Sequence, residues 1–526
     1  MASTALAIIQ SICRTISGTI VSFIAFLIYG WRPKKTVPPV TNPLLLESGL
    51  SLARKIRKRQ VTSVEVIQAY ITRIEEVNPL TNAVIATRFD EALDEAKAVD
   101  AILDSENIPD KYSEENAPYL GVPFTVKEAF AVKGLPNSSG VVARKDMRCT
   151  DDAVVIRRMR EAGAIPIALT NVSELCMWYE SNNCVYGRSN NAYDNRRMVG
   201  GSSGGEGANL AASGSVIGIG SDIGGSIRMP CFFNGIFGHK TTTGIVPNVG
   251  QFPCAMGKRS EFLSTGPMCR YAADLEPMLS IMAGEEGLAK MKLGTPVDLR
   301  KLKYFSIVDD GGSLLVSPVS PELKAIQAKV VKYLEDSLEV TVTETQVRRL
   351  RYSFPIWSSM MSKHNDGQTF TMLMGDSGPD VKPALELLKW IFQSSNHTLP
   401  AIGLGIGEKL ERLTPKNTQE KLCKAAEKLQ AELEDLLGSD GILLYPSHPK
   451  VAPYHNSPLC TPFNFAYTGV FNILGFPITQ VPLGLNEKGI PLGIQVIARR
   501  YNDHLTLAVA RQLEEGFGGW REPIHG

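Results

Sequence analysis

The most informative part of the sequence is residues 200–240, which read GGSSGGEGANLAASGSVIGIGSDIGGSIRMPCFFNGIFGHK. Between residues 200 and 226 there are ten glycines and six serines, with apolar runs of helix and strand type threaded between them. A low-complexity linker lacks such apolar runs. Glycine lets the backbone approach a ligand closely, and the serines supply hydroxyl groups beside exposed backbone N–H groups. We therefore expect this segment to form the active site of a serine hydrolase.

The segments around this stretch alternate between strand and helix patterns. Helices are expected at 62–74, 90–103, 152–162, 204–212, 321–338, 419–437 and 503–517, and strands at 122–127, 164–169, 215–220, 304–308, 339–343, 441–445, 478–481 and 492–497. Such alternation predicts an α/β fold whose mostly parallel or mixed sheet is sandwiched by helices. No repeat and no change of composition divides the chain after residue 44, so we expect one catalytic domain over residues 45–526.

Composition excludes several classes of protein. Hydrophobic residues make up 44% of the 526 residues and charged residues 21%, which is typical of a globular protein. The net charge of +1 gives no electrostatic reason to expect a nucleic-acid partner. The nine cysteines are scattered and include no C-x-x-C pair. A disulfide scaffold or a zinc site is therefore not expected.

The N-terminal region is more apolar than the rest. Residues 16–31 (ISGTIVSFIAFLIYGW) carry no charge, and basic residues follow at once. A spanning helix needs about 20 apolar residues, and no A-x-A-like cleavage site follows the run. Residues 1–32 are therefore predicted to be an uncleaved membrane anchor, followed by a proline-rich linker at 33–44. This predicts a single-pass membrane protein with a cytoplasmic catalytic domain, at an endomembrane or lipid-droplet surface.

Two serines in the segment are candidate nucleophiles. Asp222-Ile223-Gly224-Gly225-Ser226 follows the expected strand at 215–220, and its small residues leave consecutive N–H groups free to stabilise an oxyanion. Ser226 would then attack a carbonyl held in that nest, although a plain glycine-rich turn would have the same sequence. Alternatively, residues 200–204 match the G-x-S-x-G elbow of α/β-hydrolases. In that case Ser202 is the nucleophile, with His448 or His504 as its base.

A serine nucleophile requires a base, and Lys127 is a candidate. It ends the run GVPFTVK, whose other members are apolar or hydroxylic. Burial disfavours the ammonium form and lowers a lysine pKa towards neutrality, which allows the amine to accept a proton. A lysine at a strand end is more often solvated, so this assignment depends on its burial.

Three strings together resemble the amidase signature family: GVPFTVK, GGSSGGEG and GSDIGGSIR. The spacings also agree, with 75 residues from Lys127 to Ser202 and 24 from Ser202 to Ser226. The resemblance extends over almost the whole chain from about residue 45. It implies a central mixed β-sheet of about a dozen strands covered by α-helices on both faces, and no metal or organic cofactor.

The resemblance also implies a role for each site residue. Ser226 would form the acyl-enzyme, and Lys127 would be the neutral base. Ser202, whose preceding peptide bond would be cis, would relay protons between them. The N–H groups of Ile223, Gly224, Gly225 and Ser226 would bind the oxyanion, and the backbone at Cys176 would lie along the acyl site.

Other polar residues near the nucleophile have simpler interpretations. Asp222 and Arg228 are expected to form an internal ion pair rather than to contact substrate. Glu206 is expected to be a helix-start carboxylate favoured by the helix dipole.

The expected function is a membrane-associated amidase that cleaves fatty-acid amides to a free fatty acid and an amine. The lipid substrate is inferred from the apolar N-terminus and from residues 384–413, which could form a monotopic membrane surface or an ordinary core helix with a loop. Met177 and Trp178 could line an apolar tunnel. The alternatives are an amidotransferase subunit that releases ammonia, and a catalytically inactive membrane scaffold. The sequence leaves the oligomeric state open, a homodimer included.

Overall fold

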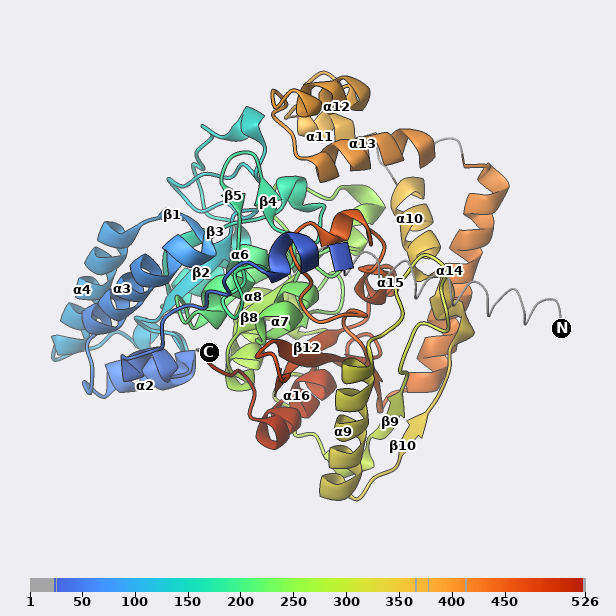
Figure 1. The fold of residues 1–526 in the computed structure, drawn as a ribbon. Coiled ribbons are helices and arrows are strands. Elements are labelled where there is room, and N and C mark those ends of the chain that lie inside the picture. Colours follow the sequence, from blue (N-terminus) through green and yellow to red (C-terminus); the bar gives the residue numbers. More distant parts are fainter. Residues whose placement is uncertain (1–22, 25, 365–366, 377, 412–413, 524–526) are drawn as a thin grey trace.

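One large mixed sheet organises the molecule (Figure 1). The computed structural model describes residues 23–24, 26–364, 367–376, 378–411 and 414–523. In this part of the chain the sheet has eleven strands. Their order is β1 (Val84–Thr87), β3 (Ile165–Thr170), β2 (Pro123–Lys127), β6 (Ile217–Asp222), β8 (Ser264–Cys269), β7 (Phe237–Lys240), β12 (Ile478–Leu485), β13 (Pro491–Ala498), β11 (Gly441–Tyr445), β9 (Lys303–Ser306) and β10 (Val342–Glu344). The expected α/β fold is confirmed.

The glycine- and serine-rich segment lies in the middle of this sheet. It forms helix α6 (Gly204–Ala211), strand β6 and helix α7 (Arg228–Asn234), and every residue of these three elements is buried. Close packing explains the glycines. A Cβ at Gly205 would lie 2.3 Å from the backbone nitrogen of Asn171, and a Cβ at Gly218 would lie 1.9 Å from Glu206 Oε1. The small residues therefore let α6 pack directly on the strands.

Helices cover both faces of the sheet, as neighbouring strand residues show. On β12, Thr479 Oγ1 donates a hydrogen bond to Thr506 Oγ1 of α16 (Asp503–Phe517). The side chain of Gln495 on β13 instead accepts a hydrogen bond from Arg228 of α7. Gln495 pairs with Gln480, the residue after Thr479. Because side chains alternate across a strand, α7 and α16 lie on opposite faces.

The remaining helices surround this core. Helix α3 begins with the predicted capping box, in which Thr62 and Glu65 bond each other's backbone N–H groups. Figure 1 shows α2, α3 and α4 together at one side of the sheet. The bounds are α2 (Gly49–Arg57), α3 (Ser63–Thr81), α4 (Phe89–Asp104), α5 (Val154–Glu161), α8 (Leu275–Leu288), α9 (Pro321–Leu338), α10 (Ser353–Lys363), α14 (Lys416–Leu437) and α15 (Ala466–Leu474), and β4 (Asn182–Asn183) with β5 (Gly187–Arg188) forms a separate small hairpin.

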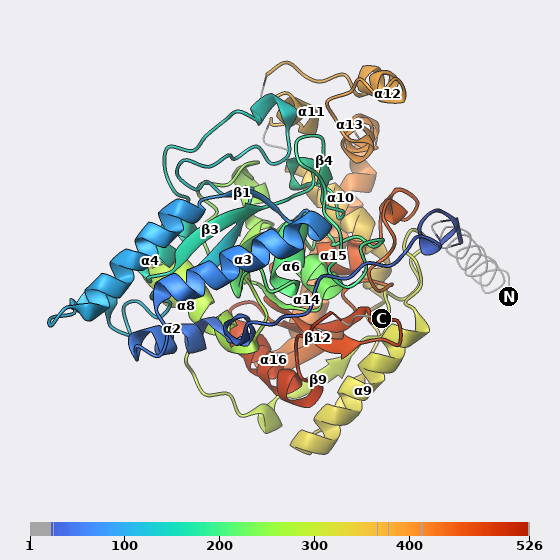
Figure 2. The same cartoon turned by 60° about the vertical axis from the view of Figure 1, so that its left-hand side comes forward.

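Three helices form a lid at one end of the molecule: α11 (Phe370–Met374), α12 (Pro383–Ile391) and α13 (Leu399–Glu411). Figures 1 and 2 both place them together beyond the sheet. They do not join the main hydrophobic core. Instead, a satellite cluster packs the lid on the body through Val141, Leu175, Leu373, Met374 and Ala401.

The prediction of a single-pass membrane protein is corrected. Among the described residues, none of the helices combines the length and apolarity that a membrane crossing requires. In the described end of the expected anchor, residues 23–24 are helical and Phe26–Gly30 form a five-residue π-helix. These residues are exposed apart from the buried Tyr29 and the half-buried Gly30. The rest of that anchor, residues 1–22 and 25, lies outside the described residues.

The expected linker at residues 33–44 packs against the body. The N–H of Val37 donates to the carbonyl oxygen of Ala192 at 3.1 Å, and the Val37 side chain is buried. Arg73 of α3 donates to the carbonyl oxygen of Pro38 at 2.7 Å. These contacts hold the proline-rich stretch against the body of the molecule.

Candidate active site

Lys127 lies where the parallel strands β2 and β6 end side by side. In α/β sheets the carboxyl ends of the strands are the usual place for a ligand site. Its Nζ is 2.7 Å from Ser202 Oγ and 2.9 Å from Ser221 Oγ, and the side chain is 1% exposed. Burial lowers the pKa of Lys127, while the nearby Cys176 and Asp222 raise it less strongly. The lysine is therefore buried, as the function requires, and shifted towards the neutral form.

Ser202 is presented by a tight backbone turn. The Gly201–Ser202 peptide bond is cis, as the resemblance implied. Gly200 has φ +82°, a conformation that favours glycine, and a Cβ at Gly201 would lie 2.4 Å from the carbonyl oxygen of Trp178. Both glycines are thus needed to bring Ser202 against the lysine.

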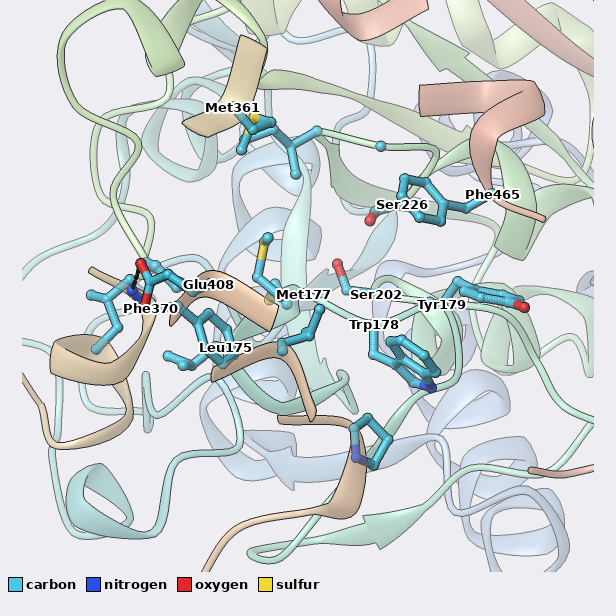
Figure 3. A pocket seen from close by; sticks show the side chains of 18 of the residues that line it. Leu175, Met177, Trp178, Tyr179, Ser202, Ser226, Met361, Phe370, Glu408 and Phe465 are labelled. Atoms are coloured by element: carbon cyan, nitrogen blue, oxygen red, sulfur yellow. Dashed lines mark hydrogen bonds between the residues drawn. The ribbon is translucent and has the colours of Figure 1, made fainter. Parts of the chain in front are cut away.

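Ser226 follows a loop organised by Asp222. The carboxylate of Asp222 accepts hydrogen bonds from the N–H groups of Gly225 at 2.7 Å and Ile227 at 3.1 Å. Gly225 has φ +119°, and a Cβ there would lie 2.0 Å from Thr468 Oγ1. The loop conformation therefore requires glycine at position 225. Figure 3 shows the hydroxyl groups of Ser202 and Ser226 directed towards one another inside the same pocket.

Asp222 and Arg228 form the expected internal ion pair. Two bonds of 3.0 Å join them, and both side chains are fully buried. Burial alone would raise the pKa of Asp222, but Arg228 and the Asn472 amide outweigh that effect and hold the pKa well below its usual range. The aspartate is therefore ionised and tied to the protein, and it acts on substrate only by shaping the loop.

The expected group of oxyanion donors changes in one respect. The N–H of Gly225 is engaged by Asp222, so it does not point at a developing oxyanion. The N–H groups of Gly224 and Ser226 have no hydrogen-bond acceptor within the described part of the chain. The carbonyl oxygen of Ile223 accepts from Trp357 Nε1 at 3.0 Å, which fixes the start of the nest. Gly224, Ser226 and Ile223 remain the candidate donors.

Cys176 lines the same pocket, close to Lys127. Both Leu175 and Cys176 have positive φ values, +55° and +56°. This left-handed bend is uncommon for residues with a side chain. Cys176 lines the pocket and lies close enough to Lys127 to raise the pKa of the lysine. The predicted contact of this backbone with the acyl site is compatible with that position.

A cavity of about 860 Å³ extends from the two serines to the lid. Figure 3 shows Met177 and Trp178 on its wall, which agrees with the tunnel expected for them. Helix α13 contributes one face to the opposite wall: Leu399, Gly403, Leu404, Gly407, Glu408 and Leu410. A Cβ at Gly403 or at Gly407 would meet no atom within 4 Å, so both glycines leave open space in the cavity. The cavity is thus mostly apolar, with polar groups at Lys127 and the serines beside it and at scattered side chains such as Gln251, Arg259 and Glu408.

The two histidines expected for the elbow alternative, His448 and His504, both lie outside the cavity. Burial lowers the pKa of His448 to about 4, and its Nδ1 lies 2.7 Å from the carbonyl oxygen of Lys450. His504 is at the start of α16. Neither lines the cavity, whereas the hydroxyl of Ser202 is bonded to Lys127.

Glu206 differs from its expected role. Its carboxyl group is hydrogen-bonded by the hydroxyls of Thr125 on β2 and Thr170 on β3. Complete burial raises the pKa of Glu206 to about 8. The group is therefore mostly protonated at neutral pH, so the helix dipole cannot explain it. It bridges α6 to the two strands instead.

Several residues of the site were not predicted from the sequence. Ser221 contacts Lys127, and its place one residue before Asp222 on β6 was the only available signal. Thr468 on α15 donates to the carbonyl oxygen of Gly224 at 2.8 Å, and no local motif marks it. In the described residues, no group of three or more His, Cys, Asp or Glu side chains is arranged to hold a metal ion.

Comparison with known proteins identifies the family of the chain. The model of the family described as Amidase matches residues 65–507. Fatty-acid amide hydrolase 2-A of Danio rerio is 55% identical over 508 residues and covers 95% of each chain. Fatty-acid amide hydrolase 2 of Homo sapiens is 55% identical over 491 residues and covers 92% of each chain.

A solved structure titled "Fatty acid amide hydrolase" has the same fold. Its TM-score is 0.70 at 23% identity, over 91% of this chain and 86% of that one. With a family model that spans most of the sequence and relatives at 55% identity, the chain belongs to the amidase signature family and is an amidase.

Proposed function

We propose that this amidase hydrolyses fatty-acid amides, both primary amides and N-acylethanolamines, through an acyl-enzyme formed on Ser226. One observation carries the proposal: a buried lysine, 2.7 Å from the Ser202 hydroxyl, lies at the end of a large apolar cavity that also receives Ser226. This arrangement supports a Ser-Ser-Lys triad rather than a histidine-based one.

Each step uses groups that the fold holds in place. Neutral Lys127 accepts the proton of Ser202, and Ser202 accepts the proton of Ser226 as the latter attacks the amide carbonyl. The oxyanion forms beside the N–H groups of Ile223, Gly224 and Ser226, which are preorganised because Asp222 fixes the loop. The relay then returns the proton to the departing amine. Water hydrolyses the ester along the same route and releases the fatty acid.

The shape of the cavity supports a long acyl chain. Its walls are mainly Leu, Met, Phe and Trp side chains, and its volume of about 860 Å³ lies at the upper end of the range for ligand pockets. The two relatives at 55% identity are named fatty-acid amide hydrolases. An amidotransferase that releases ammonia from glutamine has no use for a cavity of this length and polarity.

The test is steady-state hydrolysis by the purified chain. We expect turnover of an 18-carbon primary amide and of the matching N-acylethanolamine, with free fatty acid as the product in both reactions. Glutamine at millimolar concentration serves as the competing substrate. Release of ammonia from glutamine without turnover of either lipid amide would contradict the proposal.

We propose α12 as the surface through which the enzyme contacts a membrane. This helix exposes Leu385, Leu388, Trp390 and Ile391, and Phe392 follows it with 74% of its surface exposed. Basic groups at Lys382 and Lys389 flank the apolar face, and α13 beyond it lines the cavity. We propose that this face lies on an anionic bilayer surface, where an acyl chain could enter.

Sedimentation with vesicles tests the membrane contact. The double variant Ile391→Ser with Phe392→Ser should sediment less with vesicles that contain anionic lipid and should still hydrolyse a short-chain amide. A double variant that sediments as the parent does would exclude α12 as the contact surface.

A further inference from the structure

Glu174 joins the lid to the body at a buried point. Its side chain is 1% exposed. One carboxylate oxygen lies 2.7 Å from His397 Nδ1. The other accepts hydrogen bonds of 2.8 Å from both the N–H and the hydroxyl of Thr398. Thr398 Oγ1 in turn accepts from the N–H of Ala401, so the carboxylate fixes the first turn of α13.

The residues immediately after Glu174 belong to the catalytic pocket. Leu175 and Cys176 adopt the left-handed bend, and the N–H of Leu175 donates to the carbonyl oxygen of Ser139 at 2.8 Å. The Leu175 side chain packs in the satellite cluster with lid residues Leu373 and Ala401. Figure 3 shows Leu175 beside Phe370 of the lid, with Met177 nearer to Ser202. Two consecutive residues therefore contact the lid, and the third lies in the surroundings of Lys127.

Helix α13 also supplies the far wall of the cavity. Leu399 and Leu404 line it directly, and Gly403 and Gly407 leave space between them. A shift of the first turn of α13 would change this wall. It would also pull on the bend at 175–176 through Glu174. Unusual backbone conformations persist only where the surroundings hold them.

We propose that Glu174 is a positioning residue that couples the seating of the lid to the bend beside Lys127. The acyl-binding wall, formed by α13, and the catalytic wall, formed by residues 175–176, would then close together. This inference rests on the proposed fatty-acid amide hydrolysis. A carboxylate is suited to the task because its hydrogen bonds are charge-assisted and reach two lid residues at once.

The experiment compares Glu174→Gln with His397→Gln on an 18-carbon amide and on a short-chain amide. Glu174→Gln should lower kcat/KM for the long substrate about tenfold and also lower kcat for the short one, because it loosens both walls. His397→Gln leaves Glu174 bonded to Thr398, so it should raise KM for the long substrate and leave kcat for the short one unchanged. The double variant should be no worse than Glu174→Gln alone.

A matched control breaks another contact between lid and body. Asp376→Asn removes the ion pair with Arg144 without touching Glu174. It should leave kcat for the short amide unchanged. The coupling would be overturned if Asp376→Asn lost as much short-amide kcat as Glu174→Gln. It would also be overturned if the loss in the double variant of Glu174 and His397 were the product of the two single losses.

Two further measurements separate the possible failures. Fluorophosphonate labelling of the parent chain at Ser226 tests the proposed chemistry, independently of the lid. If the parent is labelled at Ser226 but Glu174→Gln has the same kinetics as the parent on both substrates, the coupling through Glu174 is overturned and the proposed chemistry at Ser226 stands. If Glu174→Gln does not fold, Thr398→Val removes one of the three bonds to Glu174, together with the bond from the N–H of Ala401. It should show the same pattern at smaller amplitude. Unchanged kinetics in Thr398→Val would then overturn the coupling through Glu174.

Discussion

The catalytic centre and the lid are built in opposite ways. Every residue of α6, β6 and α7 is buried, and these elements are crossed by polar bonds from Asp222, Glu206 and Arg228. In α12 only Pro383 and Glu386 are buried, and the lid rests on a small satellite cluster. The proposed chemistry would therefore depend on a fully buried part, whereas the proposed substrate selection would depend on a part with few buried contacts, which opens at lower free energy.

The largest effect should come from the rigid part. Ser226→Ala removes the nucleophile, so turnover of any amide should fall on the order of 10⁶-fold. Steady-state kinetics measure the loss, with Ser337→Ala on α9 as an expression control. Retained hydrolysis by Ser226→Ala would show that the wrong serine has been assigned.

Lys127→Ala should lower kcat about 10²- to 10⁴-fold, the usual contribution of a general base. Because burial lowers the pKa of Lys127, the parent rate should rise with pH at a lower pH than an ordinary lysine would give. Only the neutral amine accepts a proton, so the active form lies above that pKa. High pH should partly restore Lys127→Ala but not Lys127→Arg. A parent profile that is flat from neutral to alkaline pH would remove Lys127 from the mechanism.

The lid should instead control chain length. Gly407→Leu on α13 places a side chain in open space within the cavity. Hydrolysis of an 18-carbon amide should fall about 10- to 100-fold in kcat/KM, while a short-chain amide should keep its rate. The ratio of the two rates is the measurement. Equal losses on both substrates would mean that α13 does not line the acyl path.

The smallest effect concerns stability in the rigid part. The pKa of Glu206 is raised from 4.5 to about 8 in the folded chain. The stability linked to its protonation is thus fully present below pH 4.5 and lost as the pH rises through 8. Relative to Glu206→Gln, which stays neutral, the parent should lose at most a few kcal/mol of unfolding free energy across this range. Denaturant unfolding at pH 5 and pH 9 measures the difference. Parallel pH dependence in the two chains would show that Glu206 ionises freely.

Much of the fold follows from local sequence patterns. Helix α16 spans Asp503–Phe517 as predicted, and β2, β3 and β6 fall within two residues of their predicted bounds. Strands β7 and β8 were not predicted, because runs such as STGPMC at 264–269 do not alternate between apolar and polar residues and hold one β-branched side chain, Thr265. Lys127, Ser202 and Ser226 could be proposed as a triad because three short strings keep fixed spacings.

Features that depend on distant contacts could not be predicted. The protonation of Glu206 results from burial between α6, β2 and β3, and the helix-start position of this residue suggested a charged carboxylate instead. The N–H of Gly225 is bonded by Asp222 only because the loop folds back. Glu174 meets His397 across 223 positions of sequence, and no periodicity connects two such residues.

The central claim is that Ser226 carries the acyl group while Ser202 and Lys127 move the proton. The most direct test is mass mapping of the enzyme after reaction with a long-chain alkyl fluorophosphonate. We expect one adduct, on the Ser226 hydroxyl, which disappears in Ser226→Ala and forms more slowly in Lys127→Ala. An adduct on Ser202, or labelling that is unaffected by the loss of Lys127, would contradict it.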